Sequence, residues 1–317
     1  MTLLNSPRSR IVVGSATIAI ASLCLLFAHQ ISGAQAARQA ALADDAHSTA
    51  QMLPRPDASP VVVELFTSEG CSSCPPADAL LARLDRDQPV PGANIIVLGE
   101  HVDYWDYLGW HDRFSSALLT ERQRKYQTFF NLGDIFTPQM VVNGAAQFAG
   151  NDDLGITKAI EAAAAAKPVP LQFTGVEVRR DSVAFTLQDG PDTPGSLNVY
   201  AALVDPVDTT EVRSGENGGR TLHHAGVVRA LEQHASDWRM KNLGKHPEAP
   251  FTVQYREPAN LDGMRLVVFV QSKPMGPILG AAQCLLSTAP VDSAAVRGET
   301  ALISRCPAPA ASATAAR

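Results

Sequence analysis

A Cys-X-X-Cys motif between a strand pattern and a helix pattern limits the folds open to this chain more than any other feature. Residues 61–66 read VVVELF, a continuous apolar and β-branched run typical of a strand covered on both faces. After Cys71-Ser-Ser-Cys74 the apolar residues recur at helical spacing, and Pro75 and Pro76 fit the first turn of a helix. The motif is therefore expected at a helix N-terminus directly after a buried strand.

This placement favours redox chemistry of the two thiols. A helix N-terminus carries unpaired N–H groups and a partial positive charge, which stabilise the reactive thiolate form of cysteine. Cys71 is the expected nucleophile and Cys74 the resolving thiol, because two intervening residues let the second thiol reach a mixed disulfide on the first. Redox chemistry is favoured over zinc, which would need two more ligands, whereas a permanent disulfide stays open as an alternative.

The sequence near the motif adds little to thiolate formation. The first basic residue after Cys71 is Arg83, and Glu69, two positions upstream, raises the expected pKa of the Cys71 thiol. We therefore expect modest activation, which suits a reductase or thiol carrier better than a strong oxidant.

Residues 60–168 alternate strand and helix patterns. The predicted elements are, in order, 61–66, 77–84, 95–98, 115–130, 140–142, a strand after the Asn143-Gly144 turn, and a helix around 156–163. The order β, α, β, α, β, β, α predicts an α/β domain. Thr137-Pro138 immediately precedes one of the strands, and a proline there can be cis and leave the preceding backbone free to pair with a substrate.

Residues 99–114, GEHVDYWDYLGWHDRF, contain five aromatic residues, whereas aromatic residues make up only 6% of the chain. One interpretation is an aromatic and acidic substrate platform near Cys71 that includes Tyr104 and Trp105, with His101, Asp103 and Asp106 as polar anchors. The other is a packed insert whose acids cap turns. His101, Asp103 and His111 can also be combined into a metal set, but such spacings are common, and no metal is predicted.

Residues 169–287 show short alternating strands separated by turn signals. The strand candidates are 173–178, 183–187, 197–204, 251–255 and 266–270, whereas 227–235 has helical periodicity. A β-rich domain, most simply a β-sandwich, is expected. Within it, residues 214–229 combine a Gly-rich loop with two adjacent histidines. Because this stretch lacks the Lys-Ser/Thr of a phosphate loop, a turn or a contact between domains is favoured over an anion site.

The two ends of the chain look unlike the domains between them. Arg8 and Arg10 precede an uncharged stretch, 11–28, and Ala34-Gln35-Ala36 follows, so residues 1–36 are predicted to be a signal peptide or an N-terminal anchor. Both alternatives place the remainder outside the cytosol, in the periplasm or secreted. Residues 37–59 are predicted to be a flexible linker and 288–317 a disordered Ala/Ser/Pro-rich tail. In an oxidising compartment, Cys284 and Cys306 can form a structural disulfide.

Charge and composition exclude several kinds of partner. The net charge is −6 and no long basic run occurs, which argues against nucleic-acid binding. Membrane contact is expected only through residues 11–28, if they are not cleaved.

The strand, CxxC, helix and Thr137-Pro138 together resemble the thioredoxin superfamily over about residues 60–167. Two features depart from it: the interval from Cys74 to Pro138 is long, and Ser72-Ser73 is not thioredoxin's own dipeptide. In that superfamily a buried acid on the first active-site strand assists proton transfer to the resolving cysteine. The resemblance implies this role for Glu64, although an acid satisfied by a neighbouring lysine or by solvent explains Glu64 equally well.

A narrower resemblance rests on several separated motifs in the same order. TSEGCSSCPPAD, HVDYWDYLGW, ERQRKY, TPQMVVNG and SGENGGRTLHHAGVVRAL are similar to the exported thioredoxin-like proteins of the DUF1223 family, over about residues 60–284. This resemblance implies the fold and the Cys71/Cys74 pair, but no substrate.

The leading hypothesis is an exported thiol-disulfide oxidoreductase without a cofactor. Its expected partners are a thiol or disulfide substrate protein and an external electron donor or acceptor. A different class of function is a non-catalytic protein that holds a soft metal such as Cu(I) at Cys71 and Cys74, with His101, or that docks a partner. A structural adaptor with a permanent Cys71–Cys74 bond is the third hypothesis.

Overall fold

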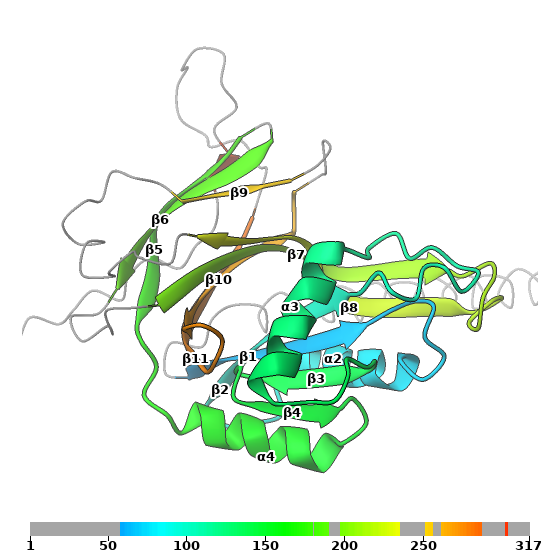
Figure 1. Cartoon of the computed structure of the whole chain (residues 1–317). Coiled ribbons are helices and arrows are strands. Elements are labelled where there is room, and N and C mark those ends of the chain that lie inside the picture. Colours follow the sequence, from blue (N-terminus) through cyan, green and yellow to red (C-terminus); the bar gives the residue numbers. More distant parts are fainter. Residues whose placement is uncertain are drawn as a thin grey trace, which may run out of the picture. The chain divides into compact units, whose positions relative to one another are not determined.

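The computed structural model describes residues 58–179, 181–189, 197–234, 251–255, 261–286 and 302–303 (Figure 1). All of them belong to one compact unit, Leu53–Arg317. The predicted signal or anchor, most of the predicted linker, almost all of the predicted tail and Cys306 lie outside the described residues. Within the described part of the chain, no helix is long and apolar enough to cross a membrane.

The first half of the described chain has the predicted order of elements. They are β1 (Ser59–Thr67), α2 (Pro75–Asp87), β2 (Ala93–His101), α3 (Ala117–Phe129), β3 (Gln139–Val142), β4 (Ala146–Ala149) and α4 (Asp153–Ala164). Strand β1 lies between β2, to which it is parallel, and β3, to which it is antiparallel. Every residue of β2 is buried, as is β1 from Val61 onward, which explains their continuous apolar sequences.

The two faces of β1 contact different helices because alternate residues of a strand point in opposite directions. Val61, Val63 and Leu65 pack with apolar residues of α2 and α4. Val62 joins a second apolar cluster that includes Leu119 of α3. The helix that follows the CxxC motif therefore covers one face of β1, and α3 covers the other.

The second half consists of strands, as the sequence predicts, but these divide between two sheets. They are β5 (Leu171–Val178), β6 (Ser182–Asp189), β7 (Leu197–Glu211), β8 (Thr221–His234), β9 (Phe251–Gln254), β10 (Arg265–Ser272), β11 (Ile278–Leu285) and β12 (Leu302–Ile303). Four of them extend the first sheet, giving the order β11-β10-β7-β8-β2-β1-β3-β4, and the others form a small sheet, β12-β5-β6-β9.

The fold is thus mixed α/β, with one large mixed sheet and a second small sheet. The large sheet crosses the domain boundary predicted at residue 168. The small sheet packs on the large one where Phe185 of β6 meets Val199 of β7 and Val268 of β10. Tyr200, next to Val199, belongs instead to the cluster beneath α3, so the small sheet lies on the face that α3 does not cover.

The helical periodicity of residues 227–235 is misleading, because residues 227–234 belong to strand β8. This strand pairs with β7 along almost its whole length, from Thr221 to His234. A long antiparallel ladder outweighs a weak local helical pattern.

Two glycines join the halves of the large sheet. Strand β2 meets β8 at the single parallel pair Gly99 and Val227. A Cβ atom on Gly99 would lie 2.9 Å from the carbonyl oxygen of Ala225, and one on Gly226 would lie 2.7 Å from the carbonyl oxygen of Val97. The backbones therefore approach too closely for side chains at this junction.

Gly226→Ala is expected to destabilise the protein by about 3 kcal/mol or more, because a positive φ and an overpacked contact add. Gly226 has φ 63°, and its new methyl group would also collide with the Val97 side chain. Gly92→Ala is the matched control: Gly92 has φ 76° but no atom within 4 Å of the new methyl group, so it should cost only about 1–2 kcal/mol. Urea unfolding measures both, and equal losses would contradict the close approach of β2 and β8.

Candidate functional site

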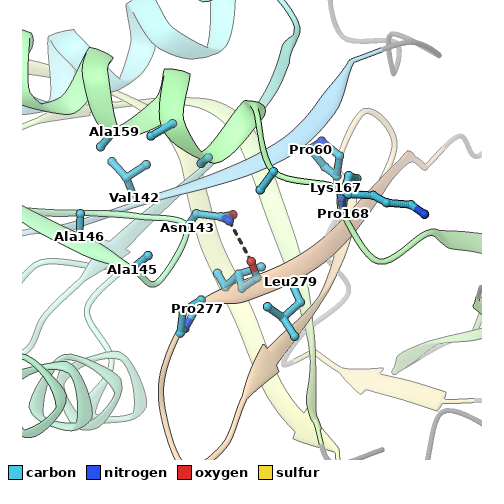
Figure 2. Close-up of a pocket in the computed structure, with 14 residues that line it drawn as sticks. Pro60, Val142, Asn143, Ala145, Ala146, Ala159, Lys167, Pro168, Pro277 and Leu279 are labelled. Carbon is cyan, nitrogen blue, oxygen red and sulfur yellow. Dashed lines mark hydrogen bonds between the residues drawn. The ribbon is translucent and has the colours of Figure 1, made fainter. Parts of the chain in front are cut away.

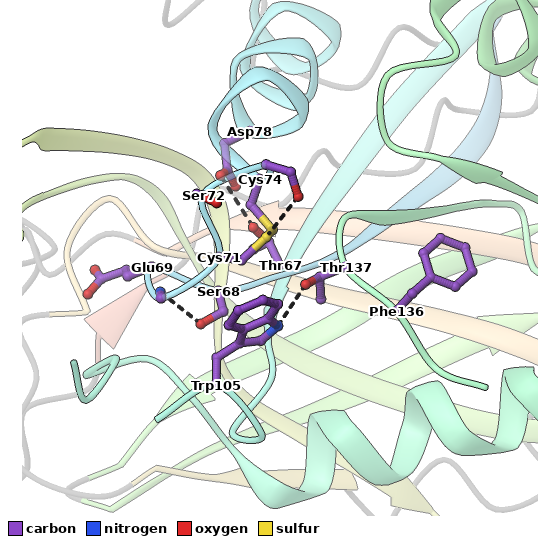
Figure 3. Close-up of a disulfide and its surroundings, with 12 residues drawn as sticks. Thr67, Ser68, Glu69, Cys71, Ser72, Cys74, Asp78, Trp105, Phe136 and Thr137 are labelled. Atoms are coloured by element: carbon purple, nitrogen blue, oxygen red, sulfur yellow. Dashed lines mark hydrogen bonds between the residues drawn. A yellow bond between two sulfur atoms is a disulfide. The ribbon is translucent and has the colours of Figure 1, made fainter. Parts of the chain in front are cut away.

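Cys71 and Cys74 are joined by a disulfide in the turn between β1 and α2 (Figure 3). Cys74 is the N-cap residue of α2, and its carbonyl oxygen accepts hydrogen bonds from the backbone N–H groups of Ala77 and Asp78. Both cysteines are fully buried, whereas Ser72 and Ser73 between them are exposed. The disulfide thus lies at a helix N-terminus, with only the intervening serines at the surface.

Trp105 and the Thr137–Pro138 segment lie at this turn. The indole N–H of Trp105 donates a 2.8 Å hydrogen bond to the Thr137 hydroxyl (Figure 3), and the Thr137–Pro138 peptide bond is cis. Trp105 also packs against Gly70, where a Cβ atom would lie 3.2 Å from that of Trp105. Pro138 faces the start of α2, since a Cβ atom on Gly150 would touch both Pro138 and Ala77.

The other predicted platform residues attach the insertion to the body of the protein. The Thr120 hydroxyl on α3 donates to the Asp103 carboxylate at 2.6 Å. The Tyr104 hydroxyl donates to Gln123 on the same helix at 3.2 Å, and burial raises the pKa of Tyr104 to about 12. His101 is buried, with Nδ1 2.7 Å from Asp112. These are the contacts of a packed insert.

The contacts of Glu64 contradict the expectation that it relays a proton to Cys74. Its side chain leaves β1 on the α3 face, opposite to α2. There Arg122 Nε donates to one carboxylate oxygen at 2.5 Å, and the Tyr126 hydroxyl donates to the other at 2.6 Å. Glu64 is therefore a paired acid, but its partner is a buried arginine 58 residues away and not the neighbouring lysine or solvent of the alternative interpretation.

A second buried acid, Glu100, lies beside this pair. Glu100 Oε1 is 3.5 Å from Arg122 Nε, and neither carboxylate oxygen has a hydrogen-bond partner among the described residues. Burial and the nearby Glu64 carboxylate raise the pKa of Glu100 well above its ordinary value. Arg122 is thus the buried cation on which both acids depend.

The most important residue that the sequence did not assign to the site is His224 of β8. Its Nε2 lies 3.6 Å from Glu69 Oε1 and its Nδ1 lies 3.7 Å from Asp78 Oδ1, so these are ion pairs longer than hydrogen bonds. Glu69 precedes Cys71 by two residues and Asp78 follows Cys74 by four. The sequence shows the two adjacent histidines but not which of them reaches the site. Because alternate residues of a strand point to opposite faces, His224 is buried and His223 is exposed.

The loop between β7 and β8 also covers the CxxC turn. The Asn217 side-chain amide donates to the carbonyl oxygens of Glu69 and Cys71, both at 2.9 Å. The Glu216 carboxylate accepts from the backbone N–H of Ser72 at 3.2 Å. The Gly-rich stretch is therefore a contact between segments, which was the favoured interpretation of its sequence.

The comparisons with known proteins identify the family. The family model described as "Protein of unknown function (DUF1223)" matches residues 62–271. The chain belongs to the DUF1223 family. A crystal structure of a protein from Agrobacterium tumefaciens is 28% identical, with a TM-score of 0.52, and the match covers 73% of this chain and 96% of that one. No curated protein matches significantly.

The alternative metal set is not assembled in this DUF1223 protein. His101 is buried against Asp112, whereas His111 is exposed and pairs with Asp106. Within the described part of the chain, no group of three or more His, Cys, Asp or Glu residues is arranged to hold a metal ion. The predicted Cys284–Cys306 bridge also remains a prediction, because Cys306 lies outside the described residues.

The DUF1223 protein has a further pocket of about 340 Å³ that shares no residue with the CxxC turn (Figure 2). Alanines of α4 form one wall, and Asn143 of the β3–β4 turn donates a 2.8 Å hydrogen bond to Ile278 of β11 across another. Lys167 is the one charged residue of its lining. The pocket therefore offers no pair of groups for acid, base or nucleophilic chemistry.

The stability of the DUF1223 protein is expected to fall as the pH rises from about 6.5 to about 9. The carboxylates of Asp78 and Glu69 raise the pKa of His224 to about 9, against the opposing effect of burial. A pKa above the unfolded value of 6.5 stabilises the fold fully below pH 6.5, and this contribution, at most about 3 kcal/mol, is lost as the pH passes the folded value. Urea unfolding across this range tests it. His224→Gln should flatten the dependence; equal slopes in both proteins would contradict it.

Proposed function

We propose that this DUF1223 protein is an exported thiol-disulfide oxidoreductase whose redox group is the Cys71–Cys74 pair. The observation that carries the proposal is the position of the disulfide, at the N-terminus of α2 directly after the central strand β1. The dipole of such a terminus favours a thiolate, whereas Pro75 and Pro76, the first two residues of α2, have no N–H group to donate. The adjacent cis Thr137–Pro138 segment and Trp105 provide the surroundings expected of a substrate site.

A thioredoxin-like fold for residues 60–168 is part of the same proposal. The parallel pair β1 and β2, the antiparallel strands β3 and β4, and helices on both faces support it. The packing of the small sheet on β7, β10 and β11 supports a sandwich-like arrangement in the second segment.

The proposed reaction passes two electrons to a substrate disulfide. The Cys71 thiolate attacks one substrate sulfur, forming a mixed disulfide and releasing the other substrate sulfur as a thiolate. Cys74 then loses its proton and attacks the Cys71 sulfur, which re-forms the intramolecular disulfide and releases the second substrate thiolate. The two substrate sulfurs are reduced, the cysteine pair is oxidised, and an external dithiol donor must reduce the pair again.

Access to Cys71 requires movement at the turn. A third sulfur must approach along the S–S axis, yet both cysteines are fully buried beneath the Asn217 contacts. We propose that binding of a substrate displaces the β7–β8 loop, whose exposed glycines, Gly215, Gly218 and Gly219, allow it to move.

A redox titration tests the proposed function. The protein is equilibrated in thiol/disulfide buffers of graded potential, free thiols are trapped by alkylation, and the sites are mapped by mass. A reversible two-electron couple confined to Cys71 and Cys74 supports the oxidoreductase, and its potential separates a reductant from an oxidant. A pair that stays oxidised throughout would favour the structural adaptor, and one blocked until a chelator is added would favour the Cu(I)-binding protein.

A further inference from the structure

The structure brings a cationic group to a motif that has no cation near it in sequence. The first basic residue after Cys71 in the chain is Arg83, whose guanidinium pairs with Asp153 on α4. His224, which comes 153 positions after Cys71, contacts acids on both sides of the CxxC turn. Its side chain is 2% exposed, so water screens these contacts little.

Glu69 and Asp78 keep other hydrogen-bond donors besides His224. The Trp110 indole N–H donates to Glu69 Oε2 at 2.6 Å, and the Thr67 hydroxyl donates to Asp78 Oδ2 at 3.3 Å. Figure 3 shows Asp78 and Thr67 with their polar groups facing each other at the disulfide. These donors stabilise the carboxylates. Burial alone would raise the pKa of Glu69, but the contacts with His224 and Trp110 outweigh it and leave this pKa below its ordinary value.

The other titratable groups around His224 are His101 of β2, Asp112 of the segment between β2 and α3, and Asp208 of β7. The His101 ring packs edge-on against the His224 ring, with centroids 4.8 Å apart, and His101 is itself paired with Asp112. Asp208 is the cross-strand partner of His224 on β7, and it pairs with Arg113 and Arg229. Asp112 and Asp208 thus have their own basic partners, which leaves Glu69 and Asp78 as the acids that His224 balances.

We propose that His224 is a positioning residue for the Cys71–Cys74 pair: as an imidazolium between Glu69 and Asp78 it offsets their negative charge at the CxxC turn and so favours the Cys71 thiolate in the reduced protein. This inference rests on the proposed function for its biological meaning. When a dithiol reduces the disulfide, two electrons and two protons enter. Cys74 then keeps its proton as a thiol, while Cys71 releases its proton to solvent and carries the negative charge. Glu69, Asp78 and the Glu216 carboxylate at Ser72 oppose that charge, and the imidazolium reduces the effect of Glu69 and Asp78.

The test measures the ionisation of Cys71 without requiring any turnover. In reduced full-length protein carrying Cys74→Ala, the ultraviolet absorbance of the thiolate is followed against pH, with a Cys71→Ser variant as the blank. His224→Gln should raise the midpoint by about one pH unit, and Glu69→Gln, which keeps an acceptor for Trp110, should lower it by a similar amount. The double variant should return close to the parent value.

His223→Gln is the matched control, because His223 is the adjacent histidine on the exposed face of β8. It should leave the midpoint unchanged. Opposite shifts from His224→Gln and Glu69→Gln support a charge effect, since a general loosening of the turn would move both midpoints in one direction. An unchanged or lowered midpoint in His224→Gln would overturn the inference. A failed redox titration of the natural pair would instead remove the proposed oxidoreductase and leave the measured shift standing.

Discussion

Cys74→Ala is expected to stop turnover and leave the protein joined covalently to its substrate. In the proposed mechanism the Cys71 thiolate can still form the mixed disulfide, but the resolving thiol at the N-cap of α2 is gone. Multiple-turnover reduction of a disulfide substrate should fall on the order of a thousandfold or more, the scale seen when a group that acts in a covalent mechanism is removed. Non-reducing electrophoresis and intact mass should show the trapped adduct.

The proposed mechanism gives the two cysteines different roles, so the two alanine variants should differ in adduct formation. Cys71→Ala should lose the activity to the same extent but form no adduct, because the attacking sulfur is absent. Ser72→Ala, at an exposed neighbour, should retain activity near the parent value, whereas Ser73 is not a neutral site because its hydroxyl lies 3.4 Å from the Cys71 sulfur. Adducts on Cys74 in the Cys71→Ala protein, with none in Cys74→Ala, would reverse the roles of nucleophile and resolving thiol.

Arg122→Met is expected to cost about 3–5 kcal/mol of stability. The change leaves Glu64 and Glu100 buried without their cation, and neither carboxylate is exposed. It also breaks the Arg122 contacts with Gln271 of β10, which link α3 to the second half of the large sheet. Urea unfolding monitored by circular dichroism measures the loss.

A control on the same helix separates buried charge from helix propensity. Arg124 is exposed on α3, so Arg124→Met should stay within about 0.5 kcal/mol of the parent. Adding Glu64→Gln to Arg122→Met should recover part of the loss, because one uncompensated carboxylate is then removed. Protonation removes the uncompensated negative charge of the buried acids in Arg122→Met, so the stability deficit of this variant should shrink as the pH falls toward 5. A deficit independent of pH would contradict this account.

The strand, CxxC motif and helix could be predicted because each depends on neighbouring residues. The apolar run of β1, the prolines opening α2 and the Asn143-Gly144 turn determine backbone conformation locally, and the observed order of the first seven elements follows them. The family resemblance also came from contiguous strings, and the match over residues 62–271 confirms it.

The sequence alone could not predict the role of Glu64 or the strand conformation of residues 227–234 in β8. A buried acid seven residues before Cys71 is equally compatible with proton transfer and with an ion pair. The face of β1 from which the Glu64 side chain projects, toward α2 or toward α3, decides between proton transfer and an ion pair. Residues 227–234 have a helical pattern, yet pairing with β7 makes them a strand. In both cases a partner far along the chain supplies the deciding contact.

What the sequence determined by itself is the Cys-X-X-Cys motif, its position at a helix N-terminus and the α/β order around it. The tertiary structure alone decided that the β-rich half extends the same sheet, and that His224 and Asn217 reach the CxxC turn from that half. The physical reason is the distance along the chain over which each interaction acts. Hydrophobic periodicity and turn chemistry act over a few residues, whereas ion pairs and strand pairing at this site join residues about 150 positions apart.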